Sequence, residues 1–145
     1  MYNLIYIGII ILIIILDQGS KHIISSRYNL GDNIKVYRNL LFIRVVKNTG
    51  AAFSILKGRQ RLIKSLTILS IILLTYYIYI SFQYDGLIWI KIGLSFILGG
   101  SLGNLIDRIR DNGVLDFIYI KLKGWPIFNI ADIFIFLGTI IVLVG

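Results

Sequence analysis

The chain has 145 residues, of which 57% are hydrophobic, and a mean hydropathy of +0.85; this composition leaves too little polar surface for a soluble domain. The net charge of +8 comes from Lys and Arg that lie beside and between apolar runs, so we expect contact with anionic lipid headgroups and no nucleic-acid binding. The absence of Cys excludes disulfides, thiol catalysis and thiolate metal ligands.

Four apolar stretches are long enough to cross a bilayer, at about residues 2–24, 61–82, 87–107 and 128–145. The first has no basic region before it and no small-residue cleavage site after it, so we predict a retained membrane helix. It reaches spanning length only if residues 17–21 belong to it. Asp17 and Lys21 are then one turn apart on the same helix face.

The region between the first two spans has strand-like patterns. Residues 31–33 form a turn signal, and the alternating or β-branched residues 34–37 and 41–46 predict short strands outside the bilayer. Residues 51–57 are apolar on one side and are followed by Gly58, which is typical of a segment on the membrane surface.

The later connections fix which regions share a side of the membrane. Only residues 83–86 join the second and third spans, which are therefore antiparallel neighbours. The longer 108–127 connection contains the strand-like residues 114–120 and the only proline, Pro126. Because crossings alternate, this connection and the 25–60 region are predicted on the same side.

The third span combines small and polar residues. Ser95, Gly99 and Gly103 recur every four residues, which favours a close helix-packing face. At the predicted end of this helix, Asn104, Asp107 and Arg108 share a face. Two interpretations stay open: a polar cluster that reaches the membrane interface, or residues that orient catalytic carboxylates and substrate.

Asp116 and Asp132 are the candidate catalytic pair. Alone, Asp116 is an ordinary polar residue of a loop strand, and Asn129 fits a helix cap. Asp132 lies deeper in the helix, so we expect that capping does not need it. Two carboxyl groups held close together share a proton, and such a pair can activate water against a peptide carbonyl.

Five motifs in order give the chain a specific resemblance. They are Asp-Gln-Gly-Ser-Lys at 17–21, Asn-Thr-Gly-Ala-Ala-Phe at 48–53, Gly-Asn-Leu-Ile-Asp-Arg at 103–108, Val-Leu-Asp-Phe-Ile at 114–118 and Phe-Asn-Ile-Ala-Asp at 128–132. From about residue 10 to 138 the chain closely resembles the lipoprotein signal peptidases, the type II signal peptidases of bacteria.

The resemblance implies a membrane all-α fold with a small β component, in one domain covering residues 1–145. It implies a four-transmembrane-helix bundle, a small extracytoplasmic β-cradle and a surface helix. The implied activity is that of an aspartic endopeptidase that cuts diacylglyceryl-modified prolipoproteins just before the lipid-modified Cys of the lipobox. The implied partners are these substrates and membrane lipids. We expect a monomer without cofactor or metal.

The resemblance also assigns roles by position. Asp116 and Asp132 match the catalytic pair. The positions that line the active site, hold the substrate or support the pair are matched by Asn48, Gly50, Asn104, Arg108, Asn129, Ala131, Asp17, Lys21 and Asp107. One departure follows the second carboxyl, where the family often has Ser and this chain has Ile133.

The charge distribution and the resemblance predict opposite orientations in the membrane. The excess of Lys and Arg in the 25–60 region would put this region in the cytoplasm by the positive-inside rule. The resemblance implies a bacterial cytoplasmic (inner) membrane protein with its active site on the outer side and both termini in the cytoplasm. We follow the resemblance, because contact with anionic lipid gives the basic residues another use.

Three other classes of function were weighed. A proton-coupled transporter needs a path to both sides, whereas every acid except Asp85 is predicted on one side. A non-catalytic assembly subunit would leave Asp116 and Asp132 without a use. A serine hydrolase is disfavoured because the single histidine, His22, has no evident orienting partner.

Overall fold

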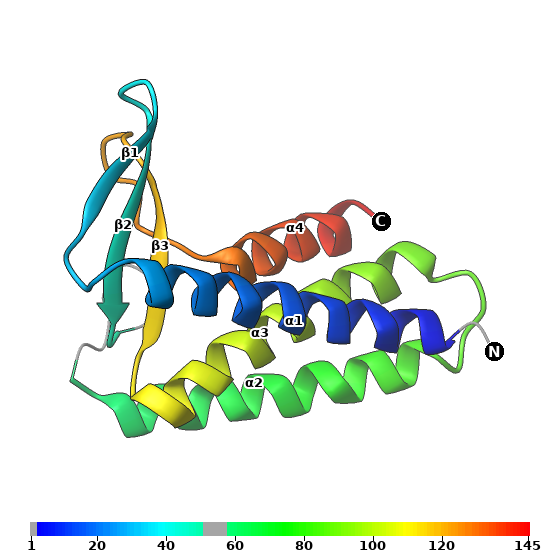
Figure 1. Ribbon diagram of the computed structural model, residues 1–145. Coiled ribbons are helices and arrows are strands. Elements are labelled where there is room, and N and C mark those ends of the chain that lie inside the picture. Colours follow the sequence, from blue (N-terminus) through cyan, green and yellow to red (C-terminus); the bar gives the residue numbers. More distant parts are fainter. Residues whose placement is uncertain (1–2, 51–57) are drawn as a thin grey trace.

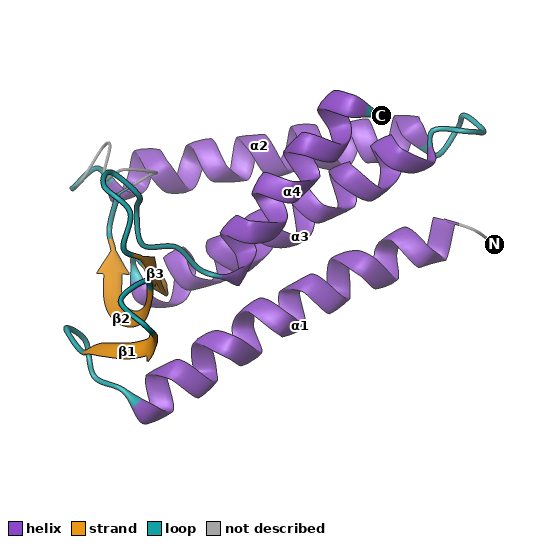
Figure 2. Cartoon of the chain, turned by 90° about the horizontal axis from the view of Figure 1, so that it is seen from above, coloured by secondary structure: helices purple, strands orange, loops and turns teal. Residues whose placement is uncertain are grey.

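The computed structural model describes residues 3–50 and 58–145. In chain order, its elements are α1 (Asn3–Arg27), β1 (Asn33–Tyr37), β2 (Leu41–Asn48), α2 (Gln60–Ser81), α3 (Ile88–Asp111), β3 (Val114–Ile120) and α4 (Ile130–Val144). Helix α3 packs against α1, α2 and α4. The three strands lie at one end of the helices, and the start of α1 and the end of α4 point away from them (Figures 1 and 2).

Three of the predicted spans are confirmed as apolar helices of membrane length, namely α1, α2 and α3. Helix α4 has only 15 residues and differs from the predicted 128–145 span. Its length of about 22 Å is less than the ~30 Å of a bilayer's hydrocarbon core. The helix starts late because Phe128 is still extended and pairs with Ile118 in a β-bridge.

The small residues of α3 mark its closest helix contacts, as predicted. A Cβ atom at Gly100 would lie 2.5 Å from the carbonyl oxygen of Ala131 on α4. A Cβ atom at Gly103 would lie 2.5 Å from Asp17 Oδ2 on α1. Glycine at these two positions therefore lets the first turn of α4 and the polar end of α1 approach the same stretch of α3.

The predicted strands form an antiparallel sheet in the order β1-β2-β3. In the β2–β3 pair, Asp116 lies opposite Val46 and Val114 lies opposite Asn48. An apolar cluster of Ile24, Val45 and Phe117 holds the sheet against the end of α1. The surface segment predicted at 51–57 lies outside the described residues.

Replacing Gly100 with Ala should lower the stability of the protein, because the new methyl group would overlap Ala131 and the Ile135 side chain. Overpacking of this kind costs about 1–3 kcal/mol. Gly19→Ala in α1 is the matched control, since nothing lies within 4 Å of a Cβ atom there. Thermal unfolding in detergent micelles should show a lower Tm for Gly100→Ala alone. Equal Tm values for the two variants would contradict the close approach of α3 and α4.

Candidate active site

Strand β3 positions Asp116 beside Asn48 of β2. Because side chains alternate along strands, Asn48 and Asp116 project from the same face as diagonal neighbours in the β2–β3 register. Asn48 Nδ2 donates a 3.0 Å hydrogen bond to Asp116 Oδ2, and the Asn48 Oδ1 atom accepts one from the backbone N–H of Gly50. Asp116 is only 3% exposed, so this carboxyl group is held inside the protein.

Helix α4 positions Asp132 through its first turn. Asn129 is the N-cap residue, and its Oδ1 atom accepts a hydrogen bond from the backbone N–H of Asp132. In return, Asp132 Oδ2 accepts a bond from the backbone N–H of Asn129, which completes a capping box. The expectation that capping does not need Asp132 is therefore wrong, because the helix starts at Ile130 and makes Asp132 its third residue.

Asn129 also joins α4 to β3. The Ile118–Phe128 bridge brings the start of α4 alongside β3. As a result, the fully buried Asn129 side chain donates a 2.7 Å hydrogen bond from Nδ2 to Asp116 Oδ1. One side chain thus contacts both carboxyl-bearing elements.

Asn104 of α3 completes the connection between the two carboxyl groups. Its Nδ2 donates a 2.8 Å bond to Asp132 Oδ1, while its Oδ1 accepts bonds of 3.1 Å from both Asn129 Nδ2 and Lys21 Nζ. Because Lys21 and the Asn129 amide group can only donate at these nitrogens, they fix which end of the Asn104 amide faces Asp132.

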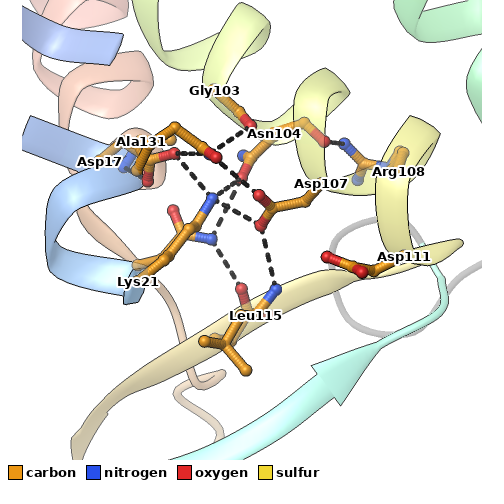
Figure 3. Close-up of polar contacts among 12 residues, drawn as sticks. Asp17, Lys21, Gly103, Asn104, Asp107, Arg108, Asp111, Leu115 and Ala131 are labelled. Atoms are coloured by element: carbon orange, nitrogen blue, oxygen red, sulfur yellow. Dashed lines mark hydrogen bonds and ion pairs between the residues drawn. The ribbon is translucent and has the colours of Figure 1, made fainter. Parts of the chain in front are cut away.

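A buried ion cluster of Lys21, Asp17 and Asp107 lies next to the Asn104 amide group. Lys21 Nζ is 2.8 Å from Asp17 Oδ2 and 2.9 Å from Asp107 Oδ2, and all three residues are at most 2% exposed. Figure 3 shows Lys21 reaching from α1 toward Asp107 on α3. The backbone N–H groups of Ala131 and Leu115 donate to Asp17 and Asp107, respectively. The cluster therefore ties α1 and α3 to both carboxyl-bearing elements.

All of the predicted site residues lie in this region, and three of the supporting ones, Asn48, Asn104 and Asn129, bond directly to a carboxyl of the pair. Among the described residues, Gly50 bonds only to Asn48, and Arg108 Nη1 makes a long 3.4 Å contact with the carbonyl oxygen of Asn104. The predicted end of the third helix at Arg108 is wrong, since α3 continues to Asp111 and stops where Asn112 adopts a left-handed conformation with φ of 54°.

Gln18 is a site residue that the sequence analysis missed. Its Nε2 contacts Asp17 Oδ2, the carbonyl oxygen of Gly103 and Asp107 Oδ1 at 2.9–3.1 Å. Its position in the sequence could have indicated this role. Gln18 lies three residues before Lys21, which puts both side chains on adjacent parts of one helix face.

The Asp116 carboxyl group is poised to hold a proton near neutral pH. Burial, followed by the nearby Asp132 carboxylate, raises the pKa of Asp116 to about 7. Hydrogen bonds from Asn48 and Asn129 act in the opposite direction because they stabilise the charged form. A carboxyl group in this state can serve as a proton donor or acceptor in neutral solution.

Two cavities flank the carboxyl pair. The more polar one, called the polar cavity here, has a volume of about 490 Å³ and is lined by Asp116, Asn48 and Thr49 together with apolar residues such as Trp125. An apolar cavity of about 500 Å³ is lined by Asp132, Ile133 and Phe136. Residues 124–126 line both cavities. A substrate bound along these cavities would bring one of its bonds to the two carboxyl groups, which suits acid–base chemistry on water and that bond.

Replacing Lys21 with Met should strongly destabilise the protein, because Asp17 and Asp107 would be left buried without their shared cation. Losing one partner of a buried ion pair costs about 3–5 kcal/mol. Lys35→Met is the matched control, since Lys35 is an exposed residue of β1. Adding Asp17→Asn to Lys21→Met should restore part of the lost Tm in detergent micelles. A Lys21→Met variant as stable as Lys35→Met would contradict the role of the cluster.

The chain was compared with known proteins by sequence and by structure. The family described as signal peptidase (SPase) II matches residues 9–145. A lipoprotein signal peptidase of Clostridium tetani is 40% identical over 139 residues, which cover 94% of this chain and 88% of the relative. A lipoprotein signal peptidase of Staphylococcus aureus is 36% identical over 139 residues, which cover 94% of this chain and 84% of the relative.

Two solved structures of bacterial membrane enzymes, both obtained by the in meso method, share this fold at 34% sequence identity. The first has a TM-score of 0.86, and the match covers 96% of this chain and 85% of the chain in that structure. The second has a TM-score of 0.83, and the match covers 96% of this chain and 90% of the chain in that structure. The family match covers nearly the whole chain, and the apolar helices agree with it, so this bacterial membrane protein belongs to the signal peptidase II family.

Proposed function

We propose that the chain is an aspartic endopeptidase that removes signal peptides from prolipoproteins, with Asp116 and Asp132 as its catalytic pair. Family membership supports peptide cleavage, and the names of the Clostridium and Staphylococcus relatives support prolipoproteins as substrates. One observation carries the assignment of the pair, namely the hydrogen-bond chain from Asp116 through Asn129 and Asn104 to Asp132.

In this proposal, Asp116 holds the proton that the pair shares and Asp132 acts first as the base. The raised pKa of Asp116 supports the first assignment. The second is supported by the two hydrogen bonds that Asp132 accepts in the first turn of α4, where the helix dipole stabilises an anion. Asp132 takes a proton from water as the water oxygen attacks the peptide carbonyl. Asp116 donates a hydrogen bond to the carbonyl oxygen, and a proton from the pair then goes to the leaving amine.

We propose that the bond cut lies just before the lipid-modified Cys of the lipobox. The apolar cavity beside Asp132 suits the apolar signal peptide, and the polar cavity beside Asp116 suits the chain that follows the bond. The diacylglyceryl group remains in the bilayer while the bond reaches the pair. Because one chain supplies every proposed site residue, a monomer is sufficient, and no cofactor takes part.

The proposed membrane arrangement is a single domain with four crossings and the sheet as a cradle on the outer side. Helix α4 would form the fourth crossing with local thinning of the bilayer to match its length. The arrangement is supported by the sheet lying away from the start of α1 and the end of α4, as an even number of crossings requires (Figure 1). Both chain ends are then cytoplasmic.

The test is cleavage of a purified, diacylglyceryl-modified prolipoprotein by the wild type, Asp116→Asn and Asp132→Asn, with a metal chelator present throughout. Each substitution at the pair should lower kcat/KM at least ~10²-fold, because each removes an acid–base group. Asp85→Asn is the matched control, since Asp85 is exposed in the turn between α2 and α3. Its rate should equal that of the wild type.

Two outcomes would count against the proposal. If either variant of the pair cleaves at a rate close to the wild type, the assignment of the pair is wrong. If the folded wild type does not cleave at all, the chain has the fold of the family without its activity, and the transporter and assembly-subunit hypotheses would be the ones to pursue.

The pH dependence of cleavage tests the state of Asp116. The wild-type kcat/KM should fall as the pH rises through about 7, because the pair then loses its shared proton. Asn48→Ala removes a donor that stabilises the charged form, so the pKa of Asp116 rises further and this alkaline limb should move to higher pH. Asn39→Ala, at the exposed β1–β2 turn, should leave the limb in place. If the alkaline limb of Asn48→Ala stays at the wild-type pH or moves to lower pH, Asp116 does not hold the proton.

A further inference from the structure

We propose that a third cavity, at the sheet end of α1 and α3, binds the phosphate group of an anionic membrane phospholipid. This cavity has a volume of about 650 Å³ and is lined by charged and polar side chains that include His22, Lys47, Arg110 and Asp111. Its described lining contains neither Asp116 nor Asp132 and shares only Lys47 with the polar cavity beside Asp116. Lipid binding here goes beyond peptide cleavage and does not require it.

In the proposed membrane arrangement, the cavity lies at the depth of the lipid headgroups. At 1.5 Å per residue, His22 lies about 29 Å along α1 from Asn3, and Arg110 lies about 33 Å along α3 from Ile88. A bilayer's hydrocarbon core is ~30 Å thick, so both side chains emerge where phosphate groups begin.

Apolar side chains from the same helix turns provide contacts for acyl chains. Ile23 follows His22 on α1, and Ile109 precedes Arg110 on α3; both are more than half exposed. The exposed Ile106 lies one turn earlier on α3. A basic cavity next to exposed isoleucines suits a molecule that has both a phosphate group and hydrocarbon chains.

The charges of the cavity favour an anion held by side chains. Among the described residues, Lys47 and His22 have no ion-pair partner, and the aliphatic part of Lys47 packs over Gly113, where a Cβ atom would lie 3.0 Å from Lys47 Cγ. Arg110 is 60% exposed and is partly neutralised by Asp111 at 2.7 Å and by Asp107 at 3.7 Å, so its exposed face can still contact an anion.

Three features of the cavity oppose an anion and restrict where it can bind. Lys21 is already committed to Asp17 and Asp107, and the carboxyl-terminal ends of α1 and α3 carry partial negative charge. Figure 3 shows Asp111 on the last turn of α3, near Asp107. The phosphate should therefore contact Lys47 and Arg110 rather than the helix ends or Lys21.

The experiment is native mass spectrometry of the full-length protein in detergent with added phosphatidylglycerol. Removing both cationic contacts in Lys47→Gln/Arg110→Gln should weaken phosphatidylglycerol binding about tenfold or more, since each basic residue near a membrane surface contributes roughly fivefold. The matched control is Lys35→Gln/Lys123→Gln, which removes the same charge at exposed positions outside the cavity. The control should weaken binding less than about twofold, because long-range attraction alone is screened by salt.

Further arms separate the sources of the phosphate group. Phosphatidylcholine should bind more weakly than phosphatidylglycerol, and inorganic phosphate at equal concentration should not displace the lipid. Equal weakening by the two double variants would overturn the proposal, because the lipid would then respond only to overall charge. Displacement by inorganic phosphate would also overturn it and indicate a free-phosphate site. Since the readout is lipid binding, it stands whether or not Asp116 and Asp132 prove catalytic; thermal unfolding of each variant checks that it is folded.

Discussion

The structure depends on one buried lysine shared by two buried aspartates. Lys21 lies within 3 Å of both Asp17 and Asp107, on helices that are far apart in sequence. Removing three charges from water is costly, and only a cation between two anions, with further hydrogen bonds to the oxygens, offsets that cost. The backbone N–H groups of Ala131 and Leu115 supply such bonds, so the cluster can be buried only when α4 and β3 are also in place.

Hydrogen bonds through amide side chains connect this ion cluster to the carboxyl pair. Lys21 fixes the orientation of Asn104, Asn104 donates to Asp132, and Asn129 joins Asn104 to Asp116. Each carboxyl group thereby receives donors that were positioned when the helices packed, and little reorganisation remains for a reaction step. The same geometry buries Asp116 beside a second acid, which raises its pKa to about 7. The stability of the fold and the protonation of the site therefore have a common origin.

Much of this arrangement could be predicted from local sequence rules. The spacing of Asp17 and Lys21 predicted that they share a helix face, where they form an ion pair. The small residues of α3 predicted its packing face, and alternation predicted the strands. The pairing of Asp116 and Asp132 was a hypothesis from their chemistry and shared membrane side, to which the resemblance added. Its geometry could not be predicted, because it depends on the bridge between Ile118 and Phe128, a long-range pairing with no local signal. The same bridge delays the start of α4, which explains why its length and the capping role of Asp132 were predicted incorrectly.

The carboxyl pair also lies at a boundary between two environments. Residues 124–126 line both the polar cavity that contains Asp116 and the apolar cavity that contains Asp132. A site buried fully in lipid would lack water for hydrolysis, and a site in open solvent would not raise the pKa of Asp116 by burial. In the proposed reaction, with one acid in each cavity, water would reach the pair from the polar side while an apolar chain approaches from the other. The boundary is set by residues 124–126, which follow β3 and line both cavities, while the cluster of Ile24, Val45 and Phe117 holds the sheet at the end of α1 and so keeps this connection beside the pair.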